Sequence, residues 1–289
     1  MASASPSEPA PGPAAGATAA LSIRPLNPIL AAIGLVGYLG RLALMTASAL
    51  RSTIRPTVAC PSFPRQWARQ LDRLLAMGLP LVGLVHVGLG SFLSMQAYFG
   101  ATFMDGIGPV TGVGLIRNLA PLMTGFILAG VVSARYIAEM GGVEPGSAEA
   151  SRMVATRLAA SVVAGPVLAI WGSLVGIAIG WLVANQMMGL TLPAFFDMFL
   201  EMLWVRDIIG IVVKGSAFGF VATLLACHEG LSRPVHGESP ADLESIYTAA
   251  CRSACLAGLA ILFINGGWFL LVYHAGPAFG PTVLAPPGG

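Results

Sequence analysis

Five stretches of the chain are apolar over the length that a transmembrane helix requires. Such a helix needs about 20 consecutive apolar residues, and the stretches that meet this condition are 77–99, 119–138, 158–184, 207–227 and 249–273. A sixth apolar stretch, residues 28–50, has Arg41 near its middle, where a charge is costly inside a bilayer. We therefore expect five transmembrane helices, preceded by an elbow helix at residues 28–50 that lies in the membrane interface.

The segment between this elbow and the first span has the pattern of an amphipathic helix. Three arginines recur at every fourth position and so share one helix face, while leucines supply part of the opposite face: Arg65, Arg69, Arg73, Leu71, Leu74 and Leu75. This pattern predicts a helix on the cytoplasmic membrane surface within residues 51–76. A short interfacial helix is expected on the outer side at 192–204, with Pro193 near its start and Trp204 as an anchor.

The distribution of arginine predicts the orientation in the membrane, because cytoplasmic loops carry an excess of Lys and Arg. The segments expected inside contain several arginines: 51–76, 135–157 and 228–252. The segments expected outside contain at most one: 100–116 and 185–206. The N-terminus is therefore predicted in the cytoplasm and the C-terminus outside. If residues 28–50 cross the membrane instead, only the N-terminal tail changes sides.

Composition completes the predicted domain organisation. Residues 1–27 begin with a stretch rich in Ala, Pro, Ser and Gly, which is typical of a disordered tail and is placed in the cytoplasm. The elbow and the amphipathic helix occupy residues 28–76, and the five-span domain occupies 77–275. Residues 276–289, which end in Ala-Pro-Pro-Gly-Gly, are expected to be a flexible outer tail.

The composition also excludes several classes of protein. Mean hydropathy is +0.80 and charged residues make up 10% of the chain, against about a quarter in soluble domains, so we expect an all-α integral membrane protein. A net charge of +2 without a basic stripe argues against nucleic acid as a partner. The sequence has no Walker A motif, no nucleophile with a base at a suitable spacing, and no metal-ligand spacing among its cysteines and histidines. We expect no enzymatic activity, metal or cofactor in this chain.

Lys214 is the only lysine of the 289 residues, and it lies inside an apolar span. An ammonium group within a membrane is costly unless it is paired or faces water. Asp207 precedes it by about two helical turns and therefore shares its helix face. Two interpretations stay open here: a functional lysine, or a lysine that snorkels or forms a structural ion pair.

Few other polar side chains lie within the spans or at their ends. They are Ser94 and Gln96 near the outer end of the first span, Arg117 and Asn118 at the start of the second, and Asn265 in the fifth. Each alone is typical of a hydrogen bond between helices. Arg117 and Asn118, taken with Asp207 and Lys214, instead predict polar groups beside an apolar interior that suits an amphiphile.

Glycines at every fourth position predict how the helices pack. The third span has Gly172, Gly176 and Gly180, and the fourth has Gly215 and Gly219. Such repeats let helices approach closely in lipid. They indicate a compact helical bundle and are compatible with a dimer interface.

Three stretches carry a recognisable pattern. Residues 114–130 contain Arg117-Asn-Leu-Ala-Pro121, and a second stretch reads Ala138-Glu-Met-Gly141. The third stretch has the following spaced residues: Asp207, Lys214, Phe218, Gly219, Ala226, Cys227 and Gly230. Together they resemble the MlaE/YrbE permeases, the membrane subunits of ABC-type lipid transporters that work with MCE proteins. The resemblance extends from about residue 28 to residue 273.

The resemblance implies a dimer of permeases that share a lipid-holding cavity, with ABC ATPase subunits docked on the cytoplasmic side and an MCE-domain protein outside. ATP would then be bound by the partner ATPase. The expected location is the bacterial inner membrane. The cavity would lie near Arg117, Asn118, Asp207 and Lys214, with Ser94 and Gln96 as further polar candidates. Segment 139–157 would be a cytoplasmic loop that couples the ATPase to the permease through charged side chains: Glu139, Glu144, Glu149, Arg152 and Arg157.

Departures from the family pattern leave a second function open. Asn118 stands where the family has Glu, and the segment after Glu144 lacks the family's Glu-x-Ile-Asp-Ala-Leu pattern. Such divergence is expected of one half of a heterodimer. The alternative function is a scaffold subunit that does not transport and only anchors an MCE assembly. The identity of the lipid and the direction of transport cannot be read from the sequence.

Overall fold

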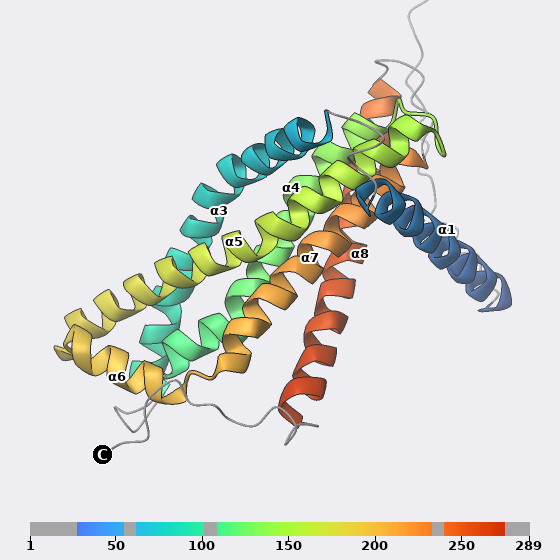
Figure 1. Ribbon diagram of the computed structural model, residues 1–289. Helices are drawn as coiled ribbons and strands as arrows, with labels where there is room; N and C mark the ends of the chain where they lie inside the picture. Colours follow the sequence, from blue (N-terminus) through green and yellow to red (C-terminus); the bar gives the residue numbers. More distant parts are fainter. Residues whose placement is uncertain (1–27, 55–61, 101–108, 233–239, 275–289) are drawn as a thin grey trace, which may run out of the picture. The chain divides into compact units, whose positions relative to one another are not determined.

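The computed structural model describes residues 28–54, 62–100, 109–232 and 240–274, and all the elements in these ranges are helices (Figure 1). The long helices are α1 (Pro28–Ile54), α3 (Phe63–Gly100), α4 (Ala120–Met140), α5 (Ala148–Met188), α7 (Val205–Leu231) and α8 (Pro240–Phe269). The shorter elements are the helix α6 (Leu192–Met202) and the π-helical turns η2 (Pro109–Val113), η3 (Leu115–Leu119) and η4 (Leu270–His274).

Five helical segments of the described chain are long and apolar enough to cross a membrane: Phe63–Gly100, Thr111–Met140, Ala148–Met188, Val205–Leu231 and Leu243–Val272. Each corresponds to one of the five spans that hydropathy predicts. The prediction of an all-α membrane protein with five transmembrane helices is therefore confirmed.

The predicted elbow, residues 28–50, is helical and forms most of α1. The chain divides into two units, Met1–Gly40 and Arg41–Gly289, and each is described by itself. In the first unit, Ile33, Val36 and Leu39 are exposed on α1. The location of this helix with respect to a membrane stays a prediction, and the tails predicted at 1–27 and 276–289 lie outside the described residues.

The amphipathic segment and the first span form one helix, α3, and not the two elements that the sequence predicts. α3 continues through the expected boundary at residues 76 and 77, and also through Pro80. Hydropathy marks where a membrane begins, not where a helix ends, and the Leu-Leu-Ala-Met residues at this boundary are strong helix formers. The carbonyl of Leu79 beside Pro80 accepts a hydrogen bond of 3.0 Å from Trp171 Nε1 on α5, which ties the two helices together.

The segment predicted as a cytoplasmic loop at 139–157 is mostly helix. α4 extends to Met140, and α5 begins at Ala148, so the connection is a short turn at residues 141–147. Ser147 ends this turn because its side chain accepts a hydrogen bond of 3.0 Å from the backbone N–H of Ala150, which caps α5. Gly146 has φ of +84°, a conformation that glycine adopts without strain.

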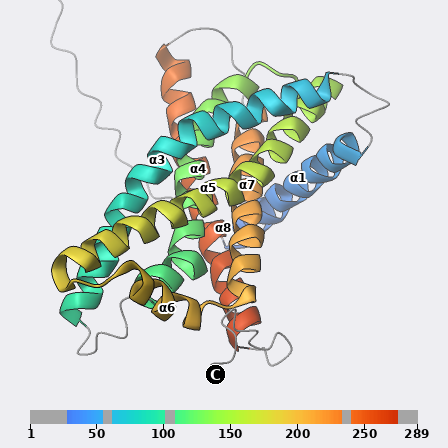
Figure 2. The same ribbon diagram turned by 60° about the vertical axis from the view of Figure 1, so that its left-hand side comes forward.

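α5 packs against α3 along one face and against α7 along another (Figures 1 and 2). Glycines lie at the closest contacts between these helices. A Cβ added to Gly90 of α3 would lie 2.2 Å from the carbonyl oxygen of Gly176, and one added to Gly219 of α7 would lie 2.4 Å from that of Ser161. A Cβ on Gly165 would lie 2.1 Å from the carbonyl oxygen of Gly215. Backbones in contact at these positions confirm the close helix packing that the glycine repeats predict.

The short helix predicted at 192–204 is α6, and Pro193 lies in its first turn. Phe195 and Phe199 are buried on one face of α6 and pack in an apolar cluster with Leu115 and Val113. Trp204 follows the helix and belongs to the polar site described below.

Candidate functional site

The first element of the site is an ion pair between η3 and the first turn of α7. The guanidinium of Arg117 donates two hydrogen bonds to Asp207, with 3.0 Å from Nε to Oδ1 and 2.9 Å from Nη2 to Oδ2. The Asp207 side chain is fully buried, and that of Arg117 is 29% exposed. This two-point geometry is the strongest form of a carboxylate–guanidinium contact.

Asp207 also caps its own helix. Its Oδ2 accepts a hydrogen bond of 3.1 Å from the backbone N–H of Trp204, just before the start of α7. A carboxylate at this end of a helix is stabilised by the helix dipole as well. The Trp204 ring is in turn covered by two guanidinium groups, with Arg206 Cζ 3.3 Å and Arg117 Cζ 5.6 Å from the ring centroid. The sequence predicts Trp204 as a membrane anchor, and in the structure its ring lies against these two arginines.

Lys214 reaches across from α7 to the η3 segment. Its ammonium group donates a hydrogen bond to the backbone carbonyl of Arg117. Arg117 lies in the π-helical turn η3, four residues before Pro121, and a proline has no N–H to donate to this carbonyl. Lys214 therefore supplies a donor to a carbonyl that receives none from Pro121.

A second hydrogen bond of Lys214 extends the site to α8. Lys214 Nζ donates to Asn265 Oδ1 at 3.3 Å, and Asn265 Nδ2 donates to Asn118 Oδ1 at 2.7 Å. We call the connected side chains the polar cluster: Arg117, Asn118, Asp207, Lys214 and Asn265. The sequence groups four of these residues, and the structure brings all four together. The sequence identifies Asn265 only as a polar residue of its span, and its amide is the link to α8.

The structure does not show the ion pair between Asp207 and Lys214 that is one of the interpretations left open by the sequence. The two share a face of α7, as their spacing predicts, but the carboxylate binds the Arg117 guanidinium, while the ammonium binds a carbonyl and an amide. Spacing along one helix places side chains on a face. It does not show which side chain of a distant segment, here Arg117 at 90 residues from Asp207, forms the ion pair.

Ser94 and Gln96 do not join the polar cluster. The Ser94 hydroxyl is buried, donates a hydrogen bond of 2.7 Å to the carbonyl of Gly180, and lies 3.2 Å from Thr111 Oγ1. Ser94 is therefore a contact between α3 and α5, next to one of the close-packed glycines. The side chain of Gln96 is exposed.

The charged residues predicted for coupling divide into two groups. Glu139 binds Arg135 on its own helix and Arg157 on α5, at 2.8 Å and 2.5 Å. The Arg157 side chain is 4% exposed and its Cζ lies 5.2 Å from the ring centroid of Tyr136. Glu144 and Glu149 are exposed at the turn and the first turn of α5, and Arg152 is half-buried. The first group holds α4 and α5 together, and the glutamates of the second are available at the surface.

The described residues include no group of three or more His, Cys, Asp or Glu side chains that could hold a metal ion. The polar cluster offers hydrogen-bonding groups and charges. It gathers two cations, one carboxylate and two amides between helices whose other faces are apolar.

Comparison with known proteins relates the chain to membrane permeases. The sequence model of a family described as Permease MlaE matches residues 67–266. A probable ABC transporter permease protein of Rickettsia bellii is 25% identical over 214 residues, which cover 68% of this chain and 80% of the relative. Proteins of the same description from Rickettsia typhi and Synechocystis are 26% and 25% identical, and each alignment covers 66% of this chain and 77% or 76% of the relative. The family match contains every residue of the polar cluster and leaves α1 outside.

Proposed function

The chain belongs to the MlaE permease family, and we propose that it is the membrane-spanning permease subunit of an ABC transporter that moves lipid or another hydrophobic molecule. In this function the chain forms the pathway with a second permease, and a separate ATPase subunit binds and hydrolyses ATP. The observation that carries the proposal is the polar cluster, which connects η3, α7 and α8 inside the matched range.

The chemistry of the cluster supports an amphiphilic substrate. An ammonium group has three N–H donors, and two of those of Lys214 have acceptors among the described residues. We assign the third to the anionic or zwitterionic head group of the substrate. Because Lys214 is 3% exposed, the head group reaches it when the helices change their packing, and nucleotide binding to the ATPase biases the equilibrium between the two packings.

Coupling to the ATPase is assigned to the turn at residues 141–147. Glu144 is exposed in this turn and Glu149 in the first turn of α5 that follows it, while the Glu139–Arg157 pair joins the helices on both sides of the turn. A push on the turn would therefore move the ends of α4 and α5 together. In the proposed orientation this turn and the N-terminus are cytoplasmic in a bacterial inner membrane, and the C-terminus and an MCE-domain partner are on the outer side.

One observation favours a second function, a scaffold subunit that anchors an MCE assembly without transporting. Asn118, which stands where the family has Glu, is engaged by Asn265 in a hydrogen bond of 2.7 Å. Asn118 therefore offers no carboxylate that could bind a substrate or accept a proton. A heterodimer in which the partner permease supplies that carboxylate would reconcile this feature with transport.

The test is a gentle purification of the tagged chain from its native membrane, with co-purifying proteins and lipids identified by mass spectrometry. An ATPase and an MCE protein support the transporter, and an MCE protein without an ATPase supports the scaffold. Cysteine cross-linking from Glu144→Cys shows where the ATPase contacts the permease. Only the transporter predicts a cross-link from this turn to the ATPase. Recovery of neither partner contradicts both functions.

Lys214→Ala then tests the role of the polar cluster within the assembled transporter. We expect it to lower lipid transport in proteoliposomes more than it lowers the amount of folded protein, because the head group loses its ammonium partner. Ser91→Ala is the control, since Ser91 is polar, lies in a span outside the cluster and donates its hydrogen bond to the Val87 carbonyl of its own helix. Parallel losses of transport and folded protein would show that Lys214 is only structural.

A further inference from the structure

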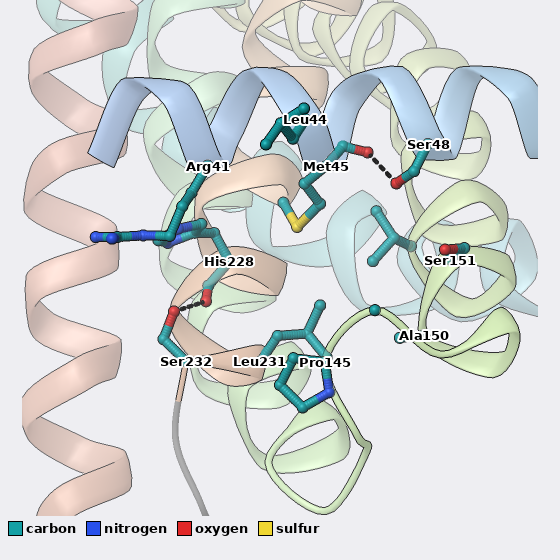
Figure 3. Close-up of a pocket in the computed structure, with 12 residues that line it drawn as sticks. Arg41, Leu44, Met45, Ser48, Pro145, Ala150, Ser151, His228, Leu231 and Ser232 are labelled. Carbon is teal, nitrogen blue, oxygen red and sulfur yellow. Dashed lines mark hydrogen bonds between the residues drawn. The ribbon is translucent and has the colours of Figure 1, made fainter. Parts of the chain in front are cut away.

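A cavity of about 770 Å³ lies at the end of the helices opposite the polar cluster. It is formed by α1 through Arg41, Leu44 and Ser48, by the first turns of α5 through Ser151 and Val154, and by the last turn of α7 through His228 (Figure 3). All of its lining residues belong to the unit Arg41–Gly289. Its volume falls within the range of small-molecule sites, about 300 to 1,000 Å³.

The charge of this cavity has one sign. Arg41 is a permanent cation in its lining, and none of the lining residues is acidic. Figure 3 shows the Arg41 side chain descending from α1 beside His228. The nearest acids along the turn, Glu144 and Glu149, are exposed and are not part of the lining. Among the described residues no carboxylate forms an ion pair with Arg41.

Two of the lining hydroxyls are already used within the protein. Ser48 Oγ donates to the carbonyl of Met45 at 2.8 Å, and Ser232 Oγ donates to that of His228 at 2.7 Å (Figure 3). The guanidinium of Arg41 is therefore the charged donor that the lining offers to a ligand, beside the hydroxyl of Ser151. A guanidinium binds phosphate oxygens in a planar, two-point geometry.

Most of the remaining lining is apolar, and it adjoins a surface of exposed apolar side chains. Leu44, Met45, Val154 and Leu231 form much of the wall. A second cavity of about 540 Å³ is lined by the following residues of the same helix, Thr46, Ala49 and Leu50, together with aromatic and aliphatic side chains. Leu44 and Leu50 are 73% and 57% exposed, as expected for side chains that meet lipid and not water.

We propose that this cavity binds the phosphate head group of an anionic phospholipid of the surrounding membrane. In this complex Arg41 binds the phosphate, and an acyl chain lies along the apolar wall. A single charge at the middle of an otherwise apolar helix is costly in a membrane, and a lipid phosphate compensates it. The ligand joins the part of α1 from Arg41 to Ser48, which lies outside the family match, to the first turns of α5 and the end of α7. The site is distinct from the polar cluster and does not depend on transport.

The test measures lipid retention by the full-length chain in detergent with native mass spectrometry, using phosphatidylglycerol, phosphatidylcholine and inorganic phosphate as probes. We expect wild type to retain phosphatidylglycerol in preference to phosphatidylcholine. Arg41→Gln should weaken this binding about tenfold, the effect of losing one charge-assisted hydrogen bond. Arg51→Gln is the matched control, because Arg51 lies on the same helix and is not part of the lining.

A second pair of variants guards against misfolding. Leu44→Glu places a carboxylate at an exposed lining position and should also weaken phosphatidylglycerol binding, whereas Ala47→Glu, exposed on the same helix outside the lining, should not. Equal retention by wild type, Arg41→Gln and Leu44→Glu overturns the proposal. Equal affinity for phosphatidylcholine overturns the selectivity for anionic lipid, and displacement of the lipid by millimolar phosphate would make the cavity a site for the free anion.

Discussion

At the scale of single residues, Asp207 has the most demanding position of the chain. Its carboxylate is fully buried, accepts two hydrogen bonds from Arg117 and one from the Trp204 backbone, and caps α7. Removal of one partner of a buried ion pair leaves an uncompensated charge, which costs far more than the pair itself contributes. The pair therefore fixes how η3 meets α7.

We predict that Asp207→Asn lowers the free energy of unfolding by about 3 kcal/mol, measured by thermal unfolding in detergent. The double variant Arg117→Leu/Asp207→Leu should be less destabilised than the sum of its two single variants, because the second substitution removes the charge that the first one leaves unpaired. Strict additivity of the three values would contradict a direct pair.

The contact between Lys214 and the carbonyl of Arg117 leads to a prediction about Pro121. Lys214→Met removes the donor from this carbonyl, and Pro121→Ala provides the backbone N–H that an α-helix uses there. We therefore expect Pro121→Ala to recover part of the stability that Lys214→Met loses, on the order of 1 kcal/mol. Thermal unfolding of the two single variants and the double variant measures this coupling. A double variant no more stable than Lys214→Met would show that the carbonyl does not need a donor.

At the scale of helices, the backbone contacts of α5 set how closely the bundle packs. Gly165 and Gly215 meet so tightly that a Cβ on Gly165 would lie 2.1 Å from a backbone oxygen, which cannot move away as the end of a side chain can. Overpacking a core typically costs about 1 to 3 kcal/mol. The contact between α5 and α7 therefore admits no side chain at this point.

We predict that Gly165→Ala separates α5 from α7 and reduces the yield of monodisperse protein, with a loss of at least about 2 kcal/mol in stability. Gly130→Ala is the control, because Gly130 lies in the middle of α4 and a Cβ there meets no atom within 4 Å. Size-exclusion chromatography and thermal unfolding compare the two variants. Similar stability and monodispersity of both variants would mean that α5 and α7 can move apart enough to accept a methyl group, and would contradict the tight contact.

The sequence predicts the spans well because long apolar runs have few other uses in a protein. It predicts the members of the polar cluster for a related reason, since charged and amide groups are rare in such runs and stand out. It misplaces the boundary within α3 because a change in hydropathy need not interrupt backbone hydrogen bonds. It also misses that residues 148–157 are helical, although Ser147 followed by Ala-Glu-Ala is a readable start signal.

What the sequence could not provide is the pairing inside the cluster. Lys214 and Asp207 are close in the chain, and Arg117 and Asn265 are distant, so local spacing favours the pair that does not form. The choice is made by tertiary contacts: the Arg117 guanidinium binds Asp207, and Lys214 binds the Arg117 carbonyl and the Asn265 amide. The sequence also could not show that Ser94 lies outside the cluster, because its partner Gly180 belongs to another helix.

At the scale of the whole molecule, the proposed function gives different roles to the end of the helices with the polar cluster and to the end with the turn at 141–147. The polar cluster receives the substrate at one end, and the turn at 141–147 receives the motion of the ATPase at the other. α4 connects the two, because Arg117 and Asn118 precede it directly and Glu139 lies near its end. Motion of the turn can reach the cluster as a rigid shift of this helix only if α4 and α5 move as one.

The Glu139–Arg157 pair is the contact that joins these helices next to the turn. We predict that Glu139→Gln leaves the ATP hydrolysis rate of the reconstituted transporter near that of wild type and lowers the amount of lipid moved for each ATP. The reason is that the turn still meets the ATPase, while α4 no longer follows α5. Glu244→Gln, which removes an exposed carboxylate from α8 outside the coupling segment, should leave this ratio unchanged. If hydrolysis and transport fall in the same proportion in Glu139→Gln, the pair serves assembly with the ATPase and not the transmission of its motion.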